Sequence, residues 1–298
     1  MRPPVIDTTN FFDIDCGDEI HVGGNIYRIT GNEKERRFGI EDPKFWVKQA
    51  VDATTGERKI VKLAYFEKFD TILGGVTINC FRDPDKESAI LETMKDNPHF
   101  MKGISFKDSK NNNIRVLDIV RGPNFWVYLD RMQMDHETYF HDQFPGIFQK
   151  LMEAFQAIAV LHSRGCRHGD IRNDHLVIEI NTDNYVWIDF DYDYLAPENP
   201  FSLDLFGIGN ILLYAAGKGI HDVYSMVNFP KKYGDLIDRV DTGDFSILDK
   251  SRLMNLKKFY PYIPDHLNNI LLHFSRNTEI YYESIGEILD DLAVVDFH

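Results

Sequence analysis

Residues 25–130 carry short runs in which apolar and polar positions alternate, a pattern typical of β-strands. The stretches NIYRIT, KFWVKQAV and RKIVKLAYF are rich in β-branched and aromatic residues, and IRVLDIV and NFWVYLDRM predict two more strands. One helix interrupts this pattern. Asp83 suits its N-cap, Pro84 suits its first position, and apolar residues follow at helical spacing. We therefore predict a small β-rich lobe that contains one helix.

After Met134 the apolar spacing becomes helical. PGIFQKLMEAFQAIAVLHSRG predicts an amphipathic helix that ends at Gly165, and SLDLFGIGNILLYAAGKG is apolar almost all round, which predicts a buried helix. Between them, HLVIEI and YVWIDFD are separated by NTDN, which predicts a hairpin. IPDHLNNILLHFSR and YESIGEILDDLAVV predict two amphipathic helices near the end of the sequence. The pattern predicts an α+β fold whose larger, helical lobe begins near residues 130–135.

The composition narrows the classes of function. The 298 residues include 33 basic and 47 acidic side chains, a formal net charge of −14, which argues against binding to nucleic acid or to an anionic membrane. No apolar run approaches the length of about 18 residues that a membrane span needs, and no signal peptide is recognisable. Cys16, Cys80 and Cys166 are too scattered for a disulfide framework or a zinc motif. We expect a cytoplasmic protein.

A dense polar run separates the predicted helix from the predicted hairpin. Because a hairpin brings its far ends together, Asp170 before it and Asp189 at its end should lie close to each other. Two converging carboxylates suit a base and a metal ligand, although aspartates that cap or form turns are an alternative. The run LHSRGCRHGDIRNDHLVIEI places seven ionisable or amide side chains in nine positions: Arg167, His168, Asp170, Arg172, Asn173, Asp174 and His175.

These motifs resemble the active-site motifs of a known superfamily. HGDIRNDHL followed by IDFD is similar to the catalytic loop and the metal-binding motif of protein-kinase-like enzymes. His168 and Asp170 match that family's histidine and catalytic aspartate, and Asp189 with Phe190 matches its metal-binding Asp-Phe pair. Gly169, where protein kinases have arginine, resembles the aminoglycoside- and choline-kinase-like branches.

The resemblance extends over about residues 25–292. VKQAVDATTGERKIVKL looks like two strands of a kinase small lobe and places Lys62 at the phosphate-binding lysine. ESAILETMKDNPHFMKG resembles the helix that supplies the partner of this lysine, which places Glu87 there. SLDLFGIGNILLY resembles the central helix of the large lobe, with Asp204 as an anchoring aspartate. The resemblance implies a bilobal protein-kinase-like fold: an N-terminal extension (1–24), an N-lobe (25–130) and a C-lobe (131–298).

The resemblance also implies a reaction. We expect transfer of the γ-phosphate of ATP to a hydroxyl group, in the first instance of a protein serine or threonine, with Mg²⁺ or Mn²⁺. Asp170 would be the base, Arg172 would stabilise the transferring phosphoryl group, and Lys62 with Glu87 would hold the nucleotide phosphates. Two alternatives stay open: a small-molecule kinase of the aminoglycoside or choline kinase type, and a pseudokinase that binds a nucleotide or a partner without turnover.

Two departures from the family concern metal and phosphate binding. His175 stands five residues after Asp170, where the family has a metal-binding asparagine. Imidazole suits Mn²⁺ or Zn²⁺ better than Mg²⁺, so with Asp189 and His175 as metal ligands we expect an altered metal preference. The glycine-rich loop is replaced by GNEKERRFGIEDP, in which Lys34, Arg36 or Arg37 could contact phosphate instead. The alternative is that this stretch is a solvated, charged hairpin tip.

Two further departures concern the segment after Asp189. Asp191 replaces the glycine of the family's motif, and only 14 residues separate Asp189 from Asp204. This is short for an activation segment, and Gly169 offers no basic group to bind a phosphorylated loop. We therefore expect no activation by phosphorylation of this segment.

Overall fold

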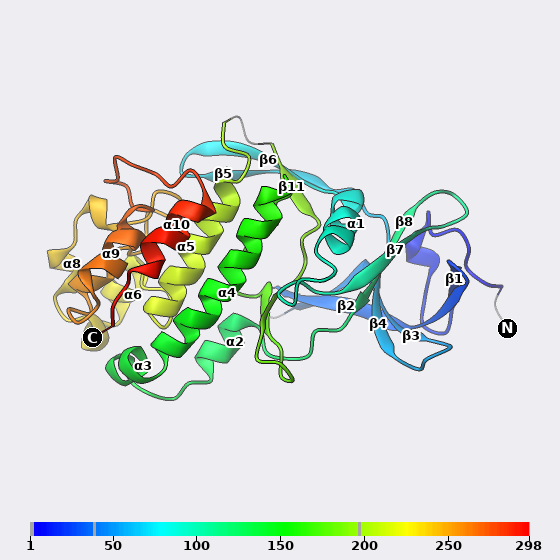
Figure 1. Ribbon diagram of the computed structural model, residues 1–298, viewed down its shortest axis with the longest axis horizontal. Helices are drawn as coiled ribbons and strands as arrows, with labels where there is room; N and C mark the ends of the chain where they lie inside the picture. The colour runs from blue at the N-terminus through cyan, green and yellow to red at the C-terminus, as the bar shows by residue number, and fades with distance from the viewer. Residues whose placement is uncertain (1–2, 38–39, 196–197, 298) are drawn as a thin grey trace. The chain divides into compact units, whose positions relative to one another are not determined.

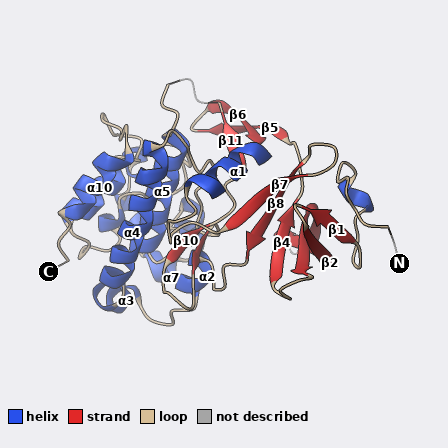
Figure 2. Cartoon of the chain, turned by 45° about the vertical axis from the view of Figure 1, so that its right-hand side comes forward, coloured by secondary structure: helices blue, strands red, loops and turns tan. Residues whose placement is uncertain are grey.

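The computed structural model describes residues 3–37, 40–195 and 198–297 (Figure 1). The chain divides into two compact units. Unit 1 comprises Met1–Lys68 and Phe81–Arg121, and unit 2 comprises Phe69–Cys80 and Gly122–His298. Figure 2 shows that strands predominate in the first unit and helices in the second. A short segment that interrupts the sequence of unit 1 therefore belongs to unit 2.

Unit 1 is built on a six-stranded sheet in the order β1-β2-β3-β4-β8-β7, and all neighbouring strands are antiparallel. Its buried side chains form one apolar core that includes Ile29, Val61 and Ile114. Strand β1 was not predicted, although Gly23 and Gly24 form the tight turn after it with φ of 58° and 80°. The strands are β1 (Glu19–Val22), β2 (Asn25–Arg37), β3 (Ile40–Asp52), β4 (Arg58–Lys62), β7 (Gly103–Lys107) and β8 (Asn113–Asp118).

Helix α1 (Pro84–Thr93) of unit 1 begins where the sequence predicts. The Asp83 side chain accepts hydrogen bonds from the backbone N–H groups of Asp85 and Lys86, and Pro84 occupies the first turn. The helix buries Glu87 together with apolar neighbours. A good cap and a buried face thus fix the element that carries Glu87.

One predicted strand is wrong. NFWVYLDRM forms helix α2 (Phe125–Asp130). The Asn124 side chain accepts a hydrogen bond from the backbone N–H of Val127, which caps the helix, and Phe125 and Leu129 lie four residues apart on its buried face. A short run of aromatic and β-branched residues fits either element, and here the cap and the packing decide in favour of the helix.

Unit 2 is mainly helical. Strands β9 (Leu176–Ile178) and β10 (Tyr185–Trp187) form the predicted antiparallel hairpin, and α5 is buried almost all round, as predicted. None of the described helices combines the length and the apolar character that crossing a bilayer requires. The helices are α3 (His136–Asp142), α4 (Phe144–Ser163), α5 (Ser202–Ala216), α6 (Val223–Asn228), α7 (Pro230–Tyr233), α8 (Leu236–Arg239), α9 (Asp265–Leu272) and α10 (Ile285–Ala293).

A hairpin that was not predicted contributes two strands to a second sheet. Strands β5 (Lys68–Leu73) and β6 (Val76–Arg82) turn at Gly74 and Gly75, whose φ angles are 60° and 93°. They pair in the order β11-β6-β5 with β11 (Tyr192–Tyr194), the strand just after Asp189. Figure 1 shows this hairpin beside β11. The segment that follows Asp189 is therefore the third strand of a sheet.

Candidate active site

The polar run is anchored to the buried helix α5. Asp204 is fully buried and accepts hydrogen bonds from the backbone N–H groups of His168 (2.7 Å) and Gly169 (2.8 Å), and it contacts His162 Nε2 at 2.9 Å. Burial alone would raise the pKa of Asp204, but these hydrogen bonds and the nearby histidines outweigh it and lower the pKa. An ionised carboxylate inside unit 2 thus fixes the start of the loop that carries Asp170.

His168 supports the same loop from within. It is fully buried, and its Nδ1 accepts a hydrogen bond from the backbone N–H of Asp170 at 3.3 Å. Its ring packs edge-on against Trp187 and Phe190, with centroid distances of 5.5 and 5.8 Å. These contacts give His168 a positioning role in the loop.

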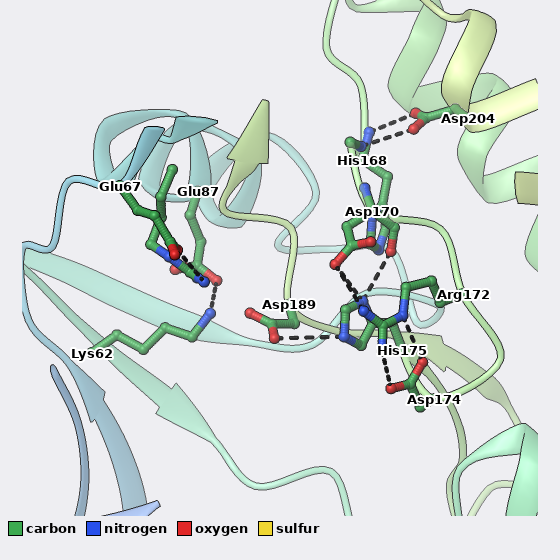
Figure 3. A network of polar contacts seen from close by, with 12 residues as sticks. Lys62, Glu67, Glu87, His168, Asp170, Arg172, Asp174, His175, Asp189 and Asp204 are labelled. Carbon is green, nitrogen blue, oxygen red and sulfur yellow. Dashed lines mark hydrogen bonds and ion pairs between the residues drawn. The ribbon is translucent and has the colours of Figure 1, made fainter. Parts of the chain in front are cut away.

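Asp170 and Asp189 lie on either side of one imidazole ring (Figure 3). His175 Nδ1 lies 2.9 Å from the backbone oxygen of Asp170 and 3.4 Å from its Oδ2, and His175 Nε2 lies 3.6 Å from Asp189 Oδ2. Because a carbonyl oxygen only accepts hydrogen bonds, Nδ1 carries a proton, and the lone pair of the neutral ring is on Nε2. The structure thus brings together three residues that the sequence assigned to catalysis and metal binding.

The two carboxylates have unusual surroundings. Burial raises the pKa of Asp170 above its ordinary value, against the opposing effect of His175 and Arg172. Asp189 has a φ of 60°, a left-handed conformation that is rare for a residue with a side chain. Such backbone strain persists where the surrounding structure enforces it, and it concentrates at functional sites.

Arg172 lies beside Asp170 but is held mainly by Asp174. Its guanidinium donates two hydrogen bonds to Asp174, at 3.0 and 2.5 Å, and its Nη1 is 3.9 Å from Asp170 Oδ2. Its side chain is 53% exposed. Arg172 is therefore pre-oriented at the edge of the cluster, with part of its positive charge open to a ligand.

In unit 1, Lys62 and Glu87 form the ion pair that the resemblance implies (Figure 3). Lys62 Nζ donates to Glu87 Oε1 at 2.8 Å, and both side chains are buried. Arg115 on β8 donates from Nε to Glu87 Oε2 at 2.9 Å and is itself fully buried. Sequence reasoning missed Arg115, although an arginine inside the apolar strand IRVLDIV was a signal. Lys34 is exposed, and the side chains of Arg36 and Arg37 lie outside the described part of the chain.

Arg167 stands in the polar run without a role assigned from the sequence, and the structure shows that it ties the segment after Asp189 to that run. Its guanidinium pairs with Asp193, donates to the backbone oxygens of Tyr194 (2.5 Å) and Pro200 (2.8 Å), and lies 4.1 Å from the centre of the Tyr194 ring. The signal was a basic residue immediately before His168. Arg167 thus holds Asp193, Tyr194 and Pro200 by side-chain and backbone contacts at once.

Comparison with known proteins identifies the fold. No protein-family model and no curated protein sequence matches the chain. In structure, the chain is similar to the kinase PK-1 of Cydia pomonella granulovirus, with a TM-score of 0.54 and 12% identity over 89% of this chain and 93% of that chain. It is also similar to the PknI kinase domain of Mycobacterium tuberculosis, with a TM-score of 0.53 and 13% identity over 94% of this chain and 98% of that chain. The chain therefore has a protein-kinase-like α+β fold, as predicted.

Proposed function

We propose that this chain is a phosphotransferase that moves the γ-phosphate of ATP to the hydroxyl group of a serine or threonine in a protein. The observation that carries the proposal is the placement of Asp170 and Asp189 on either side of His175. The kinase-like fold supports phosphoryl transfer in general. The β-rich unit 1 and the pair of closing helices, α9 and α10, favour a protein acceptor over a small molecule.

Asp170 would act on the acceptor. Its carboxylate accepts the hydroxyl proton while the new O–P bond forms, and the bond from the γ-phosphorus to its bridging oxygen breaks to release ADP. The raised pKa makes this carboxylate a stronger base than an ordinary aspartate. Arg172, 3.9 Å from Asp170 Oδ2, would stabilise negative charge on the transferring group.

Lys62 would bind the nucleotide phosphates as a point charge. Its ammonium group is positioned by Glu87, which Arg115 in turn holds through its second carboxylate oxygen. This arrangement fixes Glu87 from two sides within unit 1. Lys62 is thus oriented before any nucleotide binds, which lowers the entropic cost of binding.

Asp189 and His175 fit a divalent cation. The Nδ1–H of His175 is bound to a backbone carbonyl, and its Nε2 lone pair lies on the side of Asp189; histidines that ligate metals usually have their other nitrogen hydrogen-bonded in this way. When bound, Mg²⁺ or Mn²⁺ would neutralise charge on the phosphates. Because one ligand is a nitrogen, we infer that the site favours Mn²⁺ relative to a site made of oxygen ligands only.

The test is transfer of labelled γ-phosphate to a mixture of serine- and threonine-containing peptides, with Mg²⁺ and then with Mn²⁺. We expect Asp170→Asn to lower the rate by about 10²- to 10⁴-fold while ATP binding is kept. Asp142→Asn, which changes an exposed carboxylate at the end of α3, is the matched control and should leave the rate unchanged.

Two results would contradict the proposal. Full activity of Asp170→Asn would exclude Asp170 as the base. A wild-type chain that binds ATP but transfers phosphate with neither metal would instead support a nucleotide-binding module, with His175 as the disabling residue.

A further inference from the structure

Unit 2 contains a groove that the proposed chemistry does not use. It lies where residues 198–202 meet the start of α5 and the loop that joins α9 to α10, and its volume is about 760 Å³. Figure 1 shows α5, α9 and α10 side by side. We term it the Pro200 groove, lined by Glu198, Asn199, Pro200, Ser202, Leu205, Phe206, His273, Phe274, Glu279, Ile280, Tyr281, Tyr282 and Glu283.

The floor of the groove is apolar and preformed. Phe274 packs against Phe206 and Tyr282, with ring centroids 5.8 and 5.6 Å apart. Asn199 Nδ2 donates to the backbone oxygen of Glu283 at 2.7 Å, which joins the two rims. Ile280 on the rim is 70% exposed. A single apolar side chain of a ligand could bury itself here without rearrangement of the floor.

The rims are acidic. Glu198, Glu279 and Glu283 are exposed, and none of them forms an ion pair with a residue that the structure describes. No lysine or arginine lines the groove. Three uncompensated carboxylates around an apolar floor complement a ligand that combines positive charges with an apolar anchor.

The groove is also linked to the loop that carries Asp170. Pro200, in its wall, accepts a hydrogen bond from Arg167 at 2.8 Å. Leu205, in its floor, follows Asp204, the residue that binds the backbone of His168 and Gly169. A segment bound in the groove would therefore contact the same helix, α5, that anchors the catalytic loop.

We propose that the Pro200 groove docks a lysine- or arginine-rich segment of the protein acceptor, with one apolar side chain of that segment on the aromatic floor. This inference rests on the proposed function, because it names the class of acceptor. It assigns the groove to recognition of the acceptor and not to the reaction itself.

The first experiment measures binding without ATP. A fluorescein-labelled twelve-residue peptide of arginine, leucine and serine is titrated with the full chain and followed by fluorescence anisotropy. We expect the double variant Glu279→Lys, Glu283→Lys to bind about tenfold more weakly than the wild type. The control Glu137→Lys, Asp238→Lys makes the same change of net charge at exposed positions that do not line the groove, and it should change affinity by less than about twofold.

Two further experiments test whether the charge and the apolar side chain of the peptide complement the groove. A peptide with glutamate in place of each arginine should bind the Glu279→Lys, Glu283→Lys variant more tightly than it binds the wild type. Ile280→Ser should weaken binding of the leucine-containing peptide but not of a peptide with glycine for leucine. Val227→Ser, at an exposed position on α6, should affect neither peptide.

The outcomes separate this inference from the proposed function. If both double variants weaken peptide binding equally, the peptide is attracted by the overall net charge of −14 and not by the groove. That result would overturn the proposed docking site. In the transfer assay, the groove variant should raise KM for the basic peptide with kcat unchanged, and an unchanged KM would overturn the role in acceptor docking. Binding as expected without transfer by the wild type would instead count against the phosphotransferase.

Discussion

His175 is the residue whose chemistry differs most from the pattern of the family. An imidazole is wider than an amide, and here it contacts Asp170 through one nitrogen and lies 3.6 Å from Asp189 with the other. Its Nδ1–H is bound to the backbone oxygen of Asp170, so the ring cannot rotate without losing that hydrogen bond. Under the proposed function, the preference for one metal over another would therefore depend on this one side chain.

Replacing His175 by asparagine should move the metal preference toward Mg²⁺. An amide offers an oxygen ligand, which suits Mg²⁺, and it removes the nitrogen that suits Mn²⁺. We expect Mn²⁺ affinity, measured by calorimetry, to fall about tenfold, and the ratio of Mg²⁺- to Mn²⁺-supported activity to rise. His141→Asn, at an exposed histidine on α3, is the control. Unchanged Mn²⁺ affinity in His175→Asn would show that His175 is not a ligand.

Part of the site could be predicted because the positions of some of its residues depend on short-range sequence signals. The approach of Asp170 to Asp189 follows from the hairpin between them, and the position of Glu87 follows from the cap at Asp83. Arg115 and Arg167 could not be predicted in this way. Their partners are 28 and 26 residues away in sequence, and nothing in either local pattern reports a contact over that distance.

At the scale of elements, the sequence predicts helices that have either a strong cap or a long apolar face. Helix α1 is capped by the Asp83 side chain, whereas α4 and α5 lack a side-chain cap at their N-termini and are predicted from their long apolar faces. The β5–β6 hairpin lacks such a signal. Its apolar residues Phe69, Ile72 and Val76 are exposed, so they do not form an apolar face that alternation of apolar and polar residues would reveal. Helix α2 was wrongly predicted as a strand because six residues are too few to distinguish helical from strand spacing of apolar positions.

Helix α3 makes the stability of unit 2 depend on pH. Its first residue, His136, stacks on Tyr260 and lies 2.8 Å from the oxygen of Ala216 at the end of α5 and 2.7 Å from the hydroxyl of Tyr262. Nε2 donates to the carbonyl, so Nδ1 accepts from the tyrosine, and the neutral ring satisfies both contacts. Burial lowers the pKa of His136 to about 4, below its ordinary value of 6.5.

The unfolded chain therefore binds a proton at His136 at pH values where the folded chain does not. The free energy of unfolding should fall as the pH falls from 6.5 to about 4, with a contribution from this residue of at most about 1.4 kcal/mol per pH unit. Urea unfolding at pH 7, 6 and 5 measures this. His136→Gln should show a shallower decline, and His141→Gln, on the exposed side of α3, should decline like the wild type. Identical slopes for all three would contradict the assignment.

At the scale of the whole molecule, each of the two units is built from two separate stretches of the chain. Residues 69–80 leave unit 1, contribute the hairpin to the sheet with β11, and return before α1. The backbone N–H of Leu195 donates to Asn79 at 3.0 Å, and Phe69 packs edge-on against Tyr192. The hairpin thus gives the segment after Asp189 an ordered partner strand.

Removing the hairpin should loosen that segment. The backbone N–H of Arg82 is bound to the oxygen of Glu67, so four glycine and serine residues can replace 69–80 with little strain. Without its partner strand, the segment at residues 192–195 should be cut by chymotrypsin about tenfold faster, as followed by mass spectrometry. Cleavage at Tyr224, which is 69% exposed on α6, is the internal control. An unchanged rate at residues 192–195 would show that Arg167 alone holds the segment.

The assignment of residues 69–80 to unit 2 also determines whether the two units can be produced as separate polypeptides. The polypeptide passes between the units at three points, after Lys68, Cys80 and Arg121. Neither unit is therefore encoded by one continuous stretch of its gene. A polypeptide that starts at Gly122 would carry β11 without β6, the strand that pairs with it, and without β5. A single proteolytic cut in the turn between β5 and β6 would leave each of the two pieces with a part of this sheet. We expect such a nicked protein to stay associated through gel filtration and to separate only in denaturant.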